Sequence, residues 1–161
     1  MSLDKKIYVR IATVSDAKYI LEIIRESFVD YCNIIGIDTV EALEEKENDI
    51  LNDIIEKSVY VACLDGFIIG SVRVEMKGLL AYISRFATLP EYQSLGVGGE
   101  LLSYVENDLL SLGIRIFELY SAVENIRLKE FYISKGYSVV SVDESKGYIR
   151  GLFRKEVVDK K

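Results

Sequence analysis

The chain has no histidine, and only two cysteines and one proline among its 161 residues. Without histidine, neither a Ser-His-Asp nor a Cys-His catalytic arrangement can be built. Two cysteines alone cannot complete a usual zinc ligand set, so we expect no metal site. Cys32 and Cys63 are also too few for a disulfide framework, and Cys63 lies in an apolar run that predicts a core position. Any acid–base chemistry must therefore come from Tyr, Glu, Asp, Lys or water.

Long apolar runs are absent as well. No stretch approaches the roughly 20 consecutive apolar residues of a membrane span, and residues 1–10 have no apolar core of the signal-peptide kind. We therefore expect a cytoplasmic protein without membrane contact. Basic residues number 20 against 26 acidic ones, for a net charge of −6. This balance argues against a nucleic-acid partner, whereas it favours solubility and is compatible with a cationic substrate.

Hydrophobic periodicity predicts one α/β domain that spans residues 1–161. The expected order of elements is β-α-α-β-β-β-α-β-α-β-β. An Asp65-Gly66 pair between two apolar runs predicts a hairpin, because both central residues of that turn favour positive φ. Strands are expected over residues 6–12, 59–64, 67–75, 79–89, 115–123, 137–142 and 148–157, and helices from Ser15 or Asp16 onward and over 39–57, 98–112 and 125–134.

The helix expected over residues 39–57 combines an apolar face with a strongly acidic one. We expect the acidic face to lie in solvent, as charge runs on helices usually do. A second interpretation is that it draws a cationic amine toward a binding site. The inward side chains would be those of Val40, Leu43, Ile50, Leu51, Ile54 and Ile55, and the outward ones those of Glu41, Glu44, Glu45, Glu47, Asp49, Asp53 and Glu56.

The glycine-rich turn Gln-Ser-Leu-Gly-Val-Gly-Gly at residues 93–99 joins a predicted strand to a predicted helix. Glycines let the backbone approach a bulky anion, and the free amides at the start of the helix point at it. The turn therefore indicates a pyrophosphate site, with an ordinary glycine-rich turn as the alternative. A P-loop is excluded because no lysine follows Gly98. A dinucleotide-binding fingerprint is excluded because Leu101 stands where that motif needs a third glycine.

Two segments carry a family resemblance. Gln93, Gly96 and Gly98 form the pattern Gln-x-x-Gly-x-Gly, and residues 125–137 read Asn-Ile-Arg-Leu-Lys-Glu-Phe-Tyr-Ile-Ser-Lys-Gly-Tyr. They resemble the Gln/Arg-x-x-Gly-x-Gly/Ala and Asn-x-x-Ala-x-x-Leu/Phe-Tyr-x-x-x-Gly-Phe/Tyr signatures of the GNAT acetyltransferase family, with Leu128 where alanine is commoner. The resemblance covers the whole chain and is firmest over residues 79–137.

The resemblance implies a central mixed, mostly antiparallel sheet flanked by about four helices and splayed open between the strands 79–89 and 115–123. Acetyl-CoA would lie in that gap as the cosubstrate, with no metal. Its pantetheine arm would pair with the first of these strands, and its pyrophosphate would meet the glycine-rich turn. The implied contacts are Phe86, Ala87 and Thr88 for the pantetheine arm, Gln93, Ser94, Leu95, Gly96, Val97, Gly98 and Gly99 for the pyrophosphate, and Asn125 from the opposite side.

The reaction that the resemblance implies is direct attack of a neutral primary amine on the thioester carbonyl, in a ternary complex. A backbone amide near a bulge at residues 86–88 would stabilise the oxyanion, an effect worth about 3 kcal/mol. Tyr132 occupies the family's general-acid position, although one tyrosine of 11 beside a phenylalanine is also typical of packing. Tyr120 stands where many members place a glutamate base. Glu118, two residues earlier, is the candidate base, unless it is a solvated charge or water takes the proton.

The acceptor would be bound by residues 28–56, which carry no readable motif. Small amines, polyamines, amino acids, aminoglycosides and peptide N-termini all stay open as acceptors, and a homodimer is compatible with the sequence. Two other functions compete with catalysis. The chain could be a non-catalytic acetyl-CoA sensor or interaction module of the same fold, or it could use the glycine-rich turn for ATP or NAD.

Overall fold

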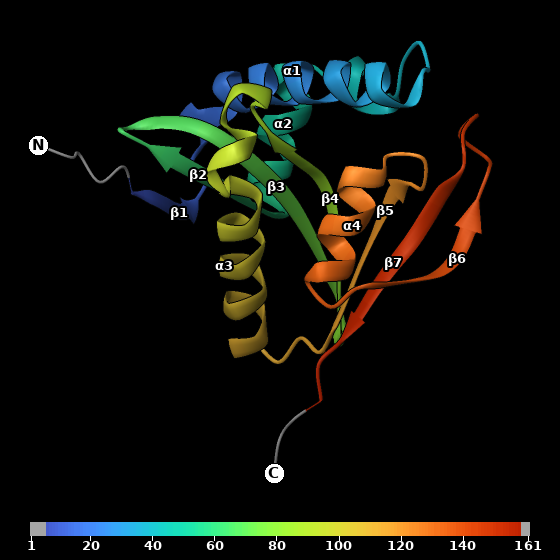
Figure 1. The fold of residues 1–161 in the computed structure, drawn as a ribbon. Coiled ribbons are helices and arrows are strands. Elements are labelled where there is room, and N and C mark those ends of the chain that lie inside the picture. Colours follow the sequence, from blue (N-terminus) through green and yellow to red (C-terminus); the bar gives the residue numbers. More distant parts are fainter. Residues whose placement is uncertain (1–5, 159–161) are drawn as a thin grey trace, which may run out of the picture.

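The structure is a computed structural model that describes residues 6–158, and seven strands within them form one sheet (Figure 1). The sheet order is β1-β2-β3-β4-β5-β7-β6. Every neighbouring pair is antiparallel except β4 and β5, which run parallel. The expected mixed, mostly antiparallel sheet is thus confirmed. The strands are β1 (Ile7–Ile11), β2 (Ser58–Leu64), β3 (Phe67–Lys77), β4 (Leu80–Thr88), β5 (Ile116–Ala122), β6 (Ser138–Asp143) and β7 (Arg150–Glu156).

Helices cover both faces of the sheet, and each face has its own apolar core. Helices α1 (Ala17–Ile35) and α2 (Glu47–Glu56) pack on one face, and α3 (Val97–Ser111) and α4 (Ile126–Ser134) on the other (Figure 1). Strand β2 is apolar along its length because alternate side chains enter the two cores, Tyr60 on the α3 side and Val61 on the α1 side. Cys63 is 1% exposed in the second of these cores, which confirms its expected place.

The sheet opens between β4 and β5, and this opening positions the site. The two strands pair only from Leu80↔Ile116 to Ile83↔Leu119. Beyond that point β4 continues beside β3 and β5 continues beside β7, so the two strands diverge (Figure 1). The β3–β4 register also shifts here, because Arg73 pairs with Ser84 while Ser71 pairs with Ala87. Two residues, Arg85 and Phe86, therefore oppose one in a β-bulge.

Turn chemistry in the first half of the sheet follows the sequence closely. Asp65 and Gly66 have φ of 51° and 81°, as the expected hairpin between β2 and β3 requires. A short 3₁₀ helix η1 (Val14–Asp16) precedes α1. Between β4 and α3 lies the 3₁₀ helix η3 (Pro90–Leu95), which begins at the only proline, a residue well suited to the first position of a helix.

The helix expected over residues 39–57 is divided, which corrects the prediction. The 3₁₀ helix η2 (Glu41–Glu44) is followed by two extended residues, Glu45 and Lys46, before α2 begins. The Asp49 side chain accepts a hydrogen bond of 2.9 Å from the backbone N–H of Lys46 and so caps the new helix start. A second N-terminus within an apolar-periodic segment explains why periodicity alone predicted one helix.

The acidic face of this region is only partly in solvent, which is a second correction. Arg73 on β3 is 4% exposed, and its guanidinium donates to Glu45 Oε2 at 2.5 Å and to Asp53 Oδ2 at 2.7 Å. A buried cation requires such partners, and these carboxylates therefore turn toward the sheet. Ile55, expected inside, is correspondingly 72% exposed.

Candidate active site

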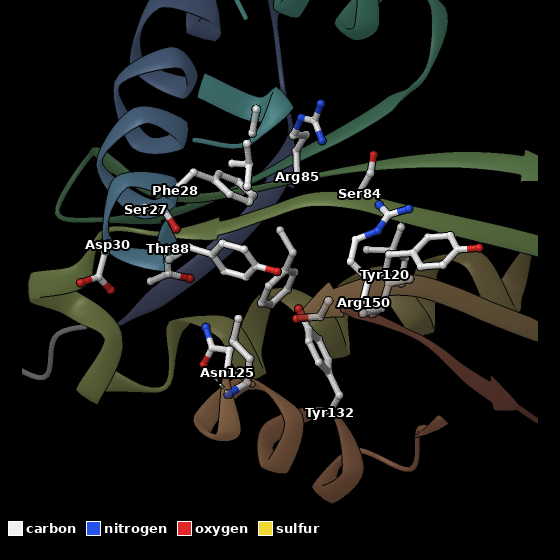
Figure 2. Close-up of a pocket in the computed structure, with 18 of the residues that line it drawn as sticks. Ser27, Phe28, Asp30, Ser84, Arg85, Thr88, Tyr120, Asn125, Tyr132 and Arg150 are labelled. Carbon is white, nitrogen blue, oxygen red and sulfur yellow. Dashed lines mark hydrogen bonds between the residues drawn. The ribbon is translucent and has the colours of Figure 1, made fainter. Parts of the chain in front are cut away.

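A cavity of about 690 Å³ fills the opening between β4 and β5 (Figure 2). Its walls come from α1, η2 and the loop before it, the diverging strands, the glycine-rich turn, α4 and the loop before β7. Because α1 and α4 lie on opposite faces of the sheet, the cavity runs through the sheet from one face to the other. Two molecules can therefore meet in it from opposite sides.

The glycine-rich turn forms one end of the cavity. Gly96 has φ of 76° and is the N-cap of α3, and Val97, Gly98 and Gly99 make the first turn. Their N–H groups have no partner within the helix, because the carbonyls that they would need precede it. A Cβ on Gly98 would stand 3.4 Å from Phe86 Cζ, so the missing side chain leaves room beside that ring. This helix start can bind an anion.

The residues expected at the turn do not all contribute side chains. Gln93, Gly96, Gly98 and Gly99 line the cavity, whereas Ser94, Leu95 and Val97 are not in its wall. Val97 is fully buried in the α3 core, so only its backbone amide is available. Gln93 Oε1 accepts a hydrogen bond from Arg127, which joins η3 to α4 beside the cavity.

At the expected pantetheine contacts, successive side chains of β4 point to opposite faces of the sheet. Phe86 and Thr88 line the cavity, and Ala87 points to the opposite face, where it is 1% exposed in the α1 core. Only the backbone of Ala87 can face a ligand. The Phe86 ring lies 6.0 Å from that of Phe131 on α4, which also lines the cavity.

Asn125 lies across the cavity from β4 and caps α4. Its Oδ1 accepts a hydrogen bond of 3.3 Å from the N–H of Leu128. The side chain is 2% exposed, and its Nδ2 group has no hydrogen-bond partner among residues 6–158. Figure 2 shows this amide at the cavity wall, where Nδ2 can donate to a ligand.

Tyr132 stands in the middle of the cavity wall. It is 3% exposed, its ring packs against those of Phe86, Tyr137 and Phe153, and its hydroxyl points from α4 into the cavity (Figure 2). Burial alone raises the pKa of this phenol above its ordinary value. The hydroxyl thus stays protonated at neutral pH, and no group within residues 6–158 hydrogen-bonds it. The ring packs and the hydroxyl is free to donate.

Glu118, the candidate base, does not lie in the cavity wall with Tyr132. Its Oε2 accepts hydrogen bonds from Arg154 Nε at 2.9 Å and from Arg154 NH2 at 2.7 Å, and it does not line the cavity. The ion pair crosses from β5 to β7 at directly paired positions. The structure therefore gives no support for Glu118 as a base. The carboxylates in the cavity wall are instead those of Asp30, Glu41 and Glu44.

The opposite end of the cavity is built from side chains that the sequence did not reveal. They are contributed by α1, β4, β5 and β7 and include Tyr31, Tyr82, Arg85, Tyr120 and Arg150. The Tyr31 hydroxyl accepts a 2.7 Å hydrogen bond from the N–H of Ala122, and burial raises its pKa. No sequence motif joins these residues. The one indication in the sequence that this region differs was Tyr120, which stands where the family that the sequence resembles often has glutamate.

Of the acidic segment, only Glu41 and Glu44 reach the cavity wall. Glu41 Oε1 accepts a 2.5 Å hydrogen bond from Lys146 Nζ, and Glu45 and Asp53 are held by Arg73. Attraction of a cationic acceptor by this segment therefore stays a prediction, and it would depend on Glu41 and Glu44 alone.

No helix within residues 6–158 is long and apolar enough to cross a membrane. In the same range, no group of three or more Cys, Asp or Glu side chains is arranged to hold a metal ion.

Comparisons with known proteins agree on one family. A model of the acetyltransferase (GNAT) family matches residues 19–137. The S-alkylcysteine N-acetyltransferase of Bacillus subtilis (strain 168) is 28% identical over 160 residues, covering 92% of this chain and 88% of that protein. The PaiA N-acetyltransferase of Thermoplasma acidophilum, solved in complex with coenzyme A, has a TM-score of 0.83 at 24% identity, over 94% of this chain and 99% of that one. The ribosomal-protein-S18-alanine N-acetyltransferase of Escherichia coli has a TM-score of 0.79 at 12% identity, over 97% of each chain.

Proposed function

The chain belongs to the acetyltransferase (GNAT) family, and from this premise we propose that it transfers the acetyl group of acetyl-CoA to a primary amine. One observation carries the proposal: the free amides at the start of α3 and the hydroxyl of Tyr132 face the same cavity. An anion site at one end and a buried proton donor at the centre suit a phosphate-bearing thioester that reacts beside Tyr132.

The residues at the turn fit acetyl-CoA. The amides of Val97, Gly98 and Gly99, with the positive end of the α3 dipole, would hold the pyrophosphate. The edge of β4 beyond Ile83 is unpaired on the β5 side, so its backbone can hydrogen-bond an extended pantetheine arm as an added strand would. Asn125 Nδ2 would donate to the same arm from α4.

In the proposed reaction the amine nitrogen attacks the thioester carbonyl carbon, the C–S bond breaks, and an acetamide forms. The bulge at Arg85 and Phe86 leaves one residue of β4 out of the β3 ladder. A backbone amide there would stabilise the oxyanion, an interaction worth about 3 kcal/mol where it has been removed from other enzymes.

Tyr132 would donate to the leaving sulfur. Burial raises the pKa of this phenol, which makes it a weaker acid than free tyrosine. A thiol has a pKa of about 8.5, so its thiolate is a weaker base than a phenolate and does not take the phenol's proton readily. The hydroxyl would therefore act as a hydrogen-bond donor to the developing thiolate, with solvent supplying the net proton afterwards. This role needs a neutral phenol, which burial maintains.

We propose that the amine loses its proton to water. Tyr120 stands where the family often places a glutamate, and Glu118 is committed to Arg154. The carboxylates that do line the cavity come from α1 and from the loop around η2. A neutral amine would then enter the cavity from solvent.

The acceptor in this proposal is a small molecule. By their names, the relatives above act on S-alkylcysteine and on the alanine of ribosomal protein S18. Here the Lys146–Glu41 ion pair joins the loop before β7 to η2 at the acceptor end. A contact across this end of the cavity would favour a small amine over a peptide N-terminus.

Two measurements test the proposed function. Acetyl-CoA should raise the melting temperature, as any ligand selective for the folded chain must, and ATP and NAD should not. With acetyl-CoA present, an amine panel should release thiol above the rate in buffer alone. Equal shifts with ATP and acetyl-CoA would contradict the cofactor assignment, and a shift without thiol release from any amine would leave a sensor.

A further inference from the structure

We infer that the acceptor is an α-amino acid whose carboxylate is bound by Arg85 and Arg150, next to the reacting amine. The inference rests on the proposed function, because it concerns the acceptor end of the same cavity. Three observations carry it: both arginines line this cavity, each has a donor without a hydrogen-bond partner among residues 6–158, and Arg85 belongs to the bulge of β4.

Arg85 is aimed by an unusual backbone. It is a bulge residue of β4 with φ of 50°, a conformation that residues other than glycine rarely adopt. Bulges next to active sites commonly redirect a side chain. Its Nε donates to Glu45 Oε1 at 3.2 Å, and its NH1 and NH2 groups have no hydrogen-bond partner among residues 6–158. The guanidinium is thus held at one edge and open at the other.

Arg150 is held in a similar way at the start of β7. Its Nε and NH2 donate to Asp143 Oδ2 at 3.1 and 2.7 Å, and its guanidinium lies 4.3 Å from the centre of the Tyr120 ring. Within residues 6–158, its NH1 has no hydrogen-bond partner. An arginine fixed by a carboxylate and an aromatic ring is preorganised to bind another anion.

Both guanidiniums reach the same cavity although β5 separates their strands in the sheet. Both line the cavity, and Figure 2 shows them entering this end of it from two different strands. Tyr82 and Tyr120 line the same cavity, and their ring centres lie 6.3 Å apart. The free donors of both arginines are therefore available to a ligand bound at this end.

No carboxylate within the described part of the chain hydrogen-bonds both arginines. Glu45 binds Arg85 and Asp143 binds Arg150. Glu41 is within the electrostatic reach of both, but it is hydrogen-bonded to Lys146 and its side chain is 62% exposed. The remaining donors are therefore available to an external anion, and arginine is well suited to bind a carboxylate.

The position relative to the bulge selects an α-amino acid. Arg85 adjoins the backbone proposed to bind the oxyanion, so an anion on Arg85 lies close to the reacting carbonyl. In an α-amino acid one carbon bears both the amine and the carboxylate. A polyamine instead brings further cations toward two guanidiniums, which is unfavourable. Phe28 and Val40, also in the cavity wall, offer apolar contact to the amino-acid side chain.

The test compares L-methionine, L-methionine amide and spermidine as acceptors, at saturating acetyl-CoA. Rates are expressed per free amine, because the amide lowers the pKa of the amine. We expect kcat/KM for methionine to exceed that for its amide by about 10- to 100-fold, the range of hydrogen bonds to charged groups. Arg85→Gln and Arg150→Gln should each lower kcat/KM for methionine toward that for the amide, and so remove most of this preference.

Arg154→Gln is the matched control. Arg154 lies on the same strand as Arg150 but pairs with Glu118 outside the cavity, so its loss should leave the preference intact. Both arginine variants should fold, since Glu45 keeps Arg73 as a partner and the Asp143 side chain is 27% exposed. The acetyl-CoA thermal shift of each variant verifies this.

Product inhibition gives a readout without a titrating amine. N-acetyl-methionine should inhibit the wild type more strongly than N-acetyl-methionine amide, and Arg85→Gln and Arg150→Gln should abolish the difference. If the amide or spermidine is the better acceptor, or if the variants keep the preference, the inference is overturned and acetyl transfer stands. If acetyl-CoA neither binds nor reacts with any of the three amines, the proposed function falls, and the inference with it.

Discussion

The two ends of the cavity are built by different means. The turn at residues 93–99 presents backbone amides from one short segment, and a single cap, Asn125, completes that end from α4. The acceptor end instead collects side chains from α1, β4, β5 and β7, segments far apart in the sequence. A backbone site needs glycine at fixed spacing, whereas a side-chain site needs only that the fold bring its members together.

Tyr132 lies where the two ends meet, and this position divides the expected effects of substitution. Changes at the turn should alter the dissociation constant of acetyl-CoA and leave the KM of the acceptor alone. Changes among the side chains at the acceptor end should do the reverse. A change at Tyr132, the junction of the two ends, should alter kcat but neither the acetyl-CoA dissociation constant nor the KM of the acceptor.

The largest effect is expected for Tyr132→Phe. This substitution keeps the ring among Phe86, Tyr137 and Phe153 and removes only the hydroxyl. Loss of one preorganised hydrogen-bond donor to a developing charge costs roughly 10²- to 10³-fold in kcat, so a fall of this size is expected. The dissociation constant of acetyl-CoA should hardly change, because the lost hydrogen bond belongs to the transition state.

Binding and turnover are measured on the same preparation of the variant. An unchanged kcat under conditions where chemistry limits the rate would make Tyr132 a packing residue. A loss of acetyl-CoA affinity in proportion to the loss of rate would assign the hydroxyl to the cofactor end.

The second effect concerns stability at the acceptor end. Arg73→Met leaves Glu45 and Asp53, which are 13% and 16% exposed, without their main partner. Breaking such a pair on one side costs about 3 kcal/mol of unfolding free energy, because charge stays buried. The acceptor KM should rise, since Glu45 also holds Arg85, while the acetyl-CoA dissociation constant stays the same.

Urea denaturation measures this loss, and Lys57→Met is the control. Lys57 also pairs with Asp53, at 3.4 Å, but it is 33% exposed, and such pairs contribute less than about 1 kcal/mol. A loss for Arg73→Met no larger than for the control would show that the buried cluster is not a stabilising anchor of η2.

The cofactor end was largely predictable because its chemistry is local. The spacing of Gln93, Gly96 and Gly98 predicted a strand–turn–helix arrangement, and the helix does begin at Val97. Asn125 at the start of the next helix is the cap that its residue type favours. The roles of these residues in binding stay predictions.

The acceptor end was not predictable, because nothing local encodes it. Arg73 is a charged residue in the buried middle of β3, and only the fold shows that it draws Glu45 and Asp53 inward. Periodicity treats every glutamate as solvated, so it predicted one continuous helix with an acidic outer face. Pairing across the sheet likewise removed Glu118 from the cavity, since Arg154 stands directly opposite it.

The third effect is expected at the turn. In Gly98→Val the new Cβ would lie 3.4 Å from Phe86 Cζ and 3.6 Å from Phe131 Cζ, and the branches would fill the space beside the free amides. The acetyl-CoA dissociation constant should rise about 10- to 100-fold, as when one or two charge-assisted hydrogen bonds are lost. Titration of the thermal shift measures it. Ser103→Val, at an exposed position of the same helix, is the control, and an equal change in both would reject the turn as the phosphate site.

The smallest effect is expected in the alkaline pH profile of kcat, which tests the environment of the Tyr132 hydroxyl. Burial raises the pKa of Tyr132, and a neutral phenol is the active form, so that form should persist to higher pH than in free tyrosine. With the ordinary pKa of about 10, half of the phenol would ionise at pH 10 and kcat would fall two-fold. We expect kcat at saturating substrates to rise as the amine deprotonates and then to stay level through about pH 10. Tyr31 and Tyr82 should add no falling limb, because burial raises their pKa values too. A fall in kcat near pH 10 that is seen in the wild type and is absent from Tyr132→Phe would contradict this expectation. It would mean that water reaches the Tyr132 hydroxyl as freely as it reaches the two ends of the cavity.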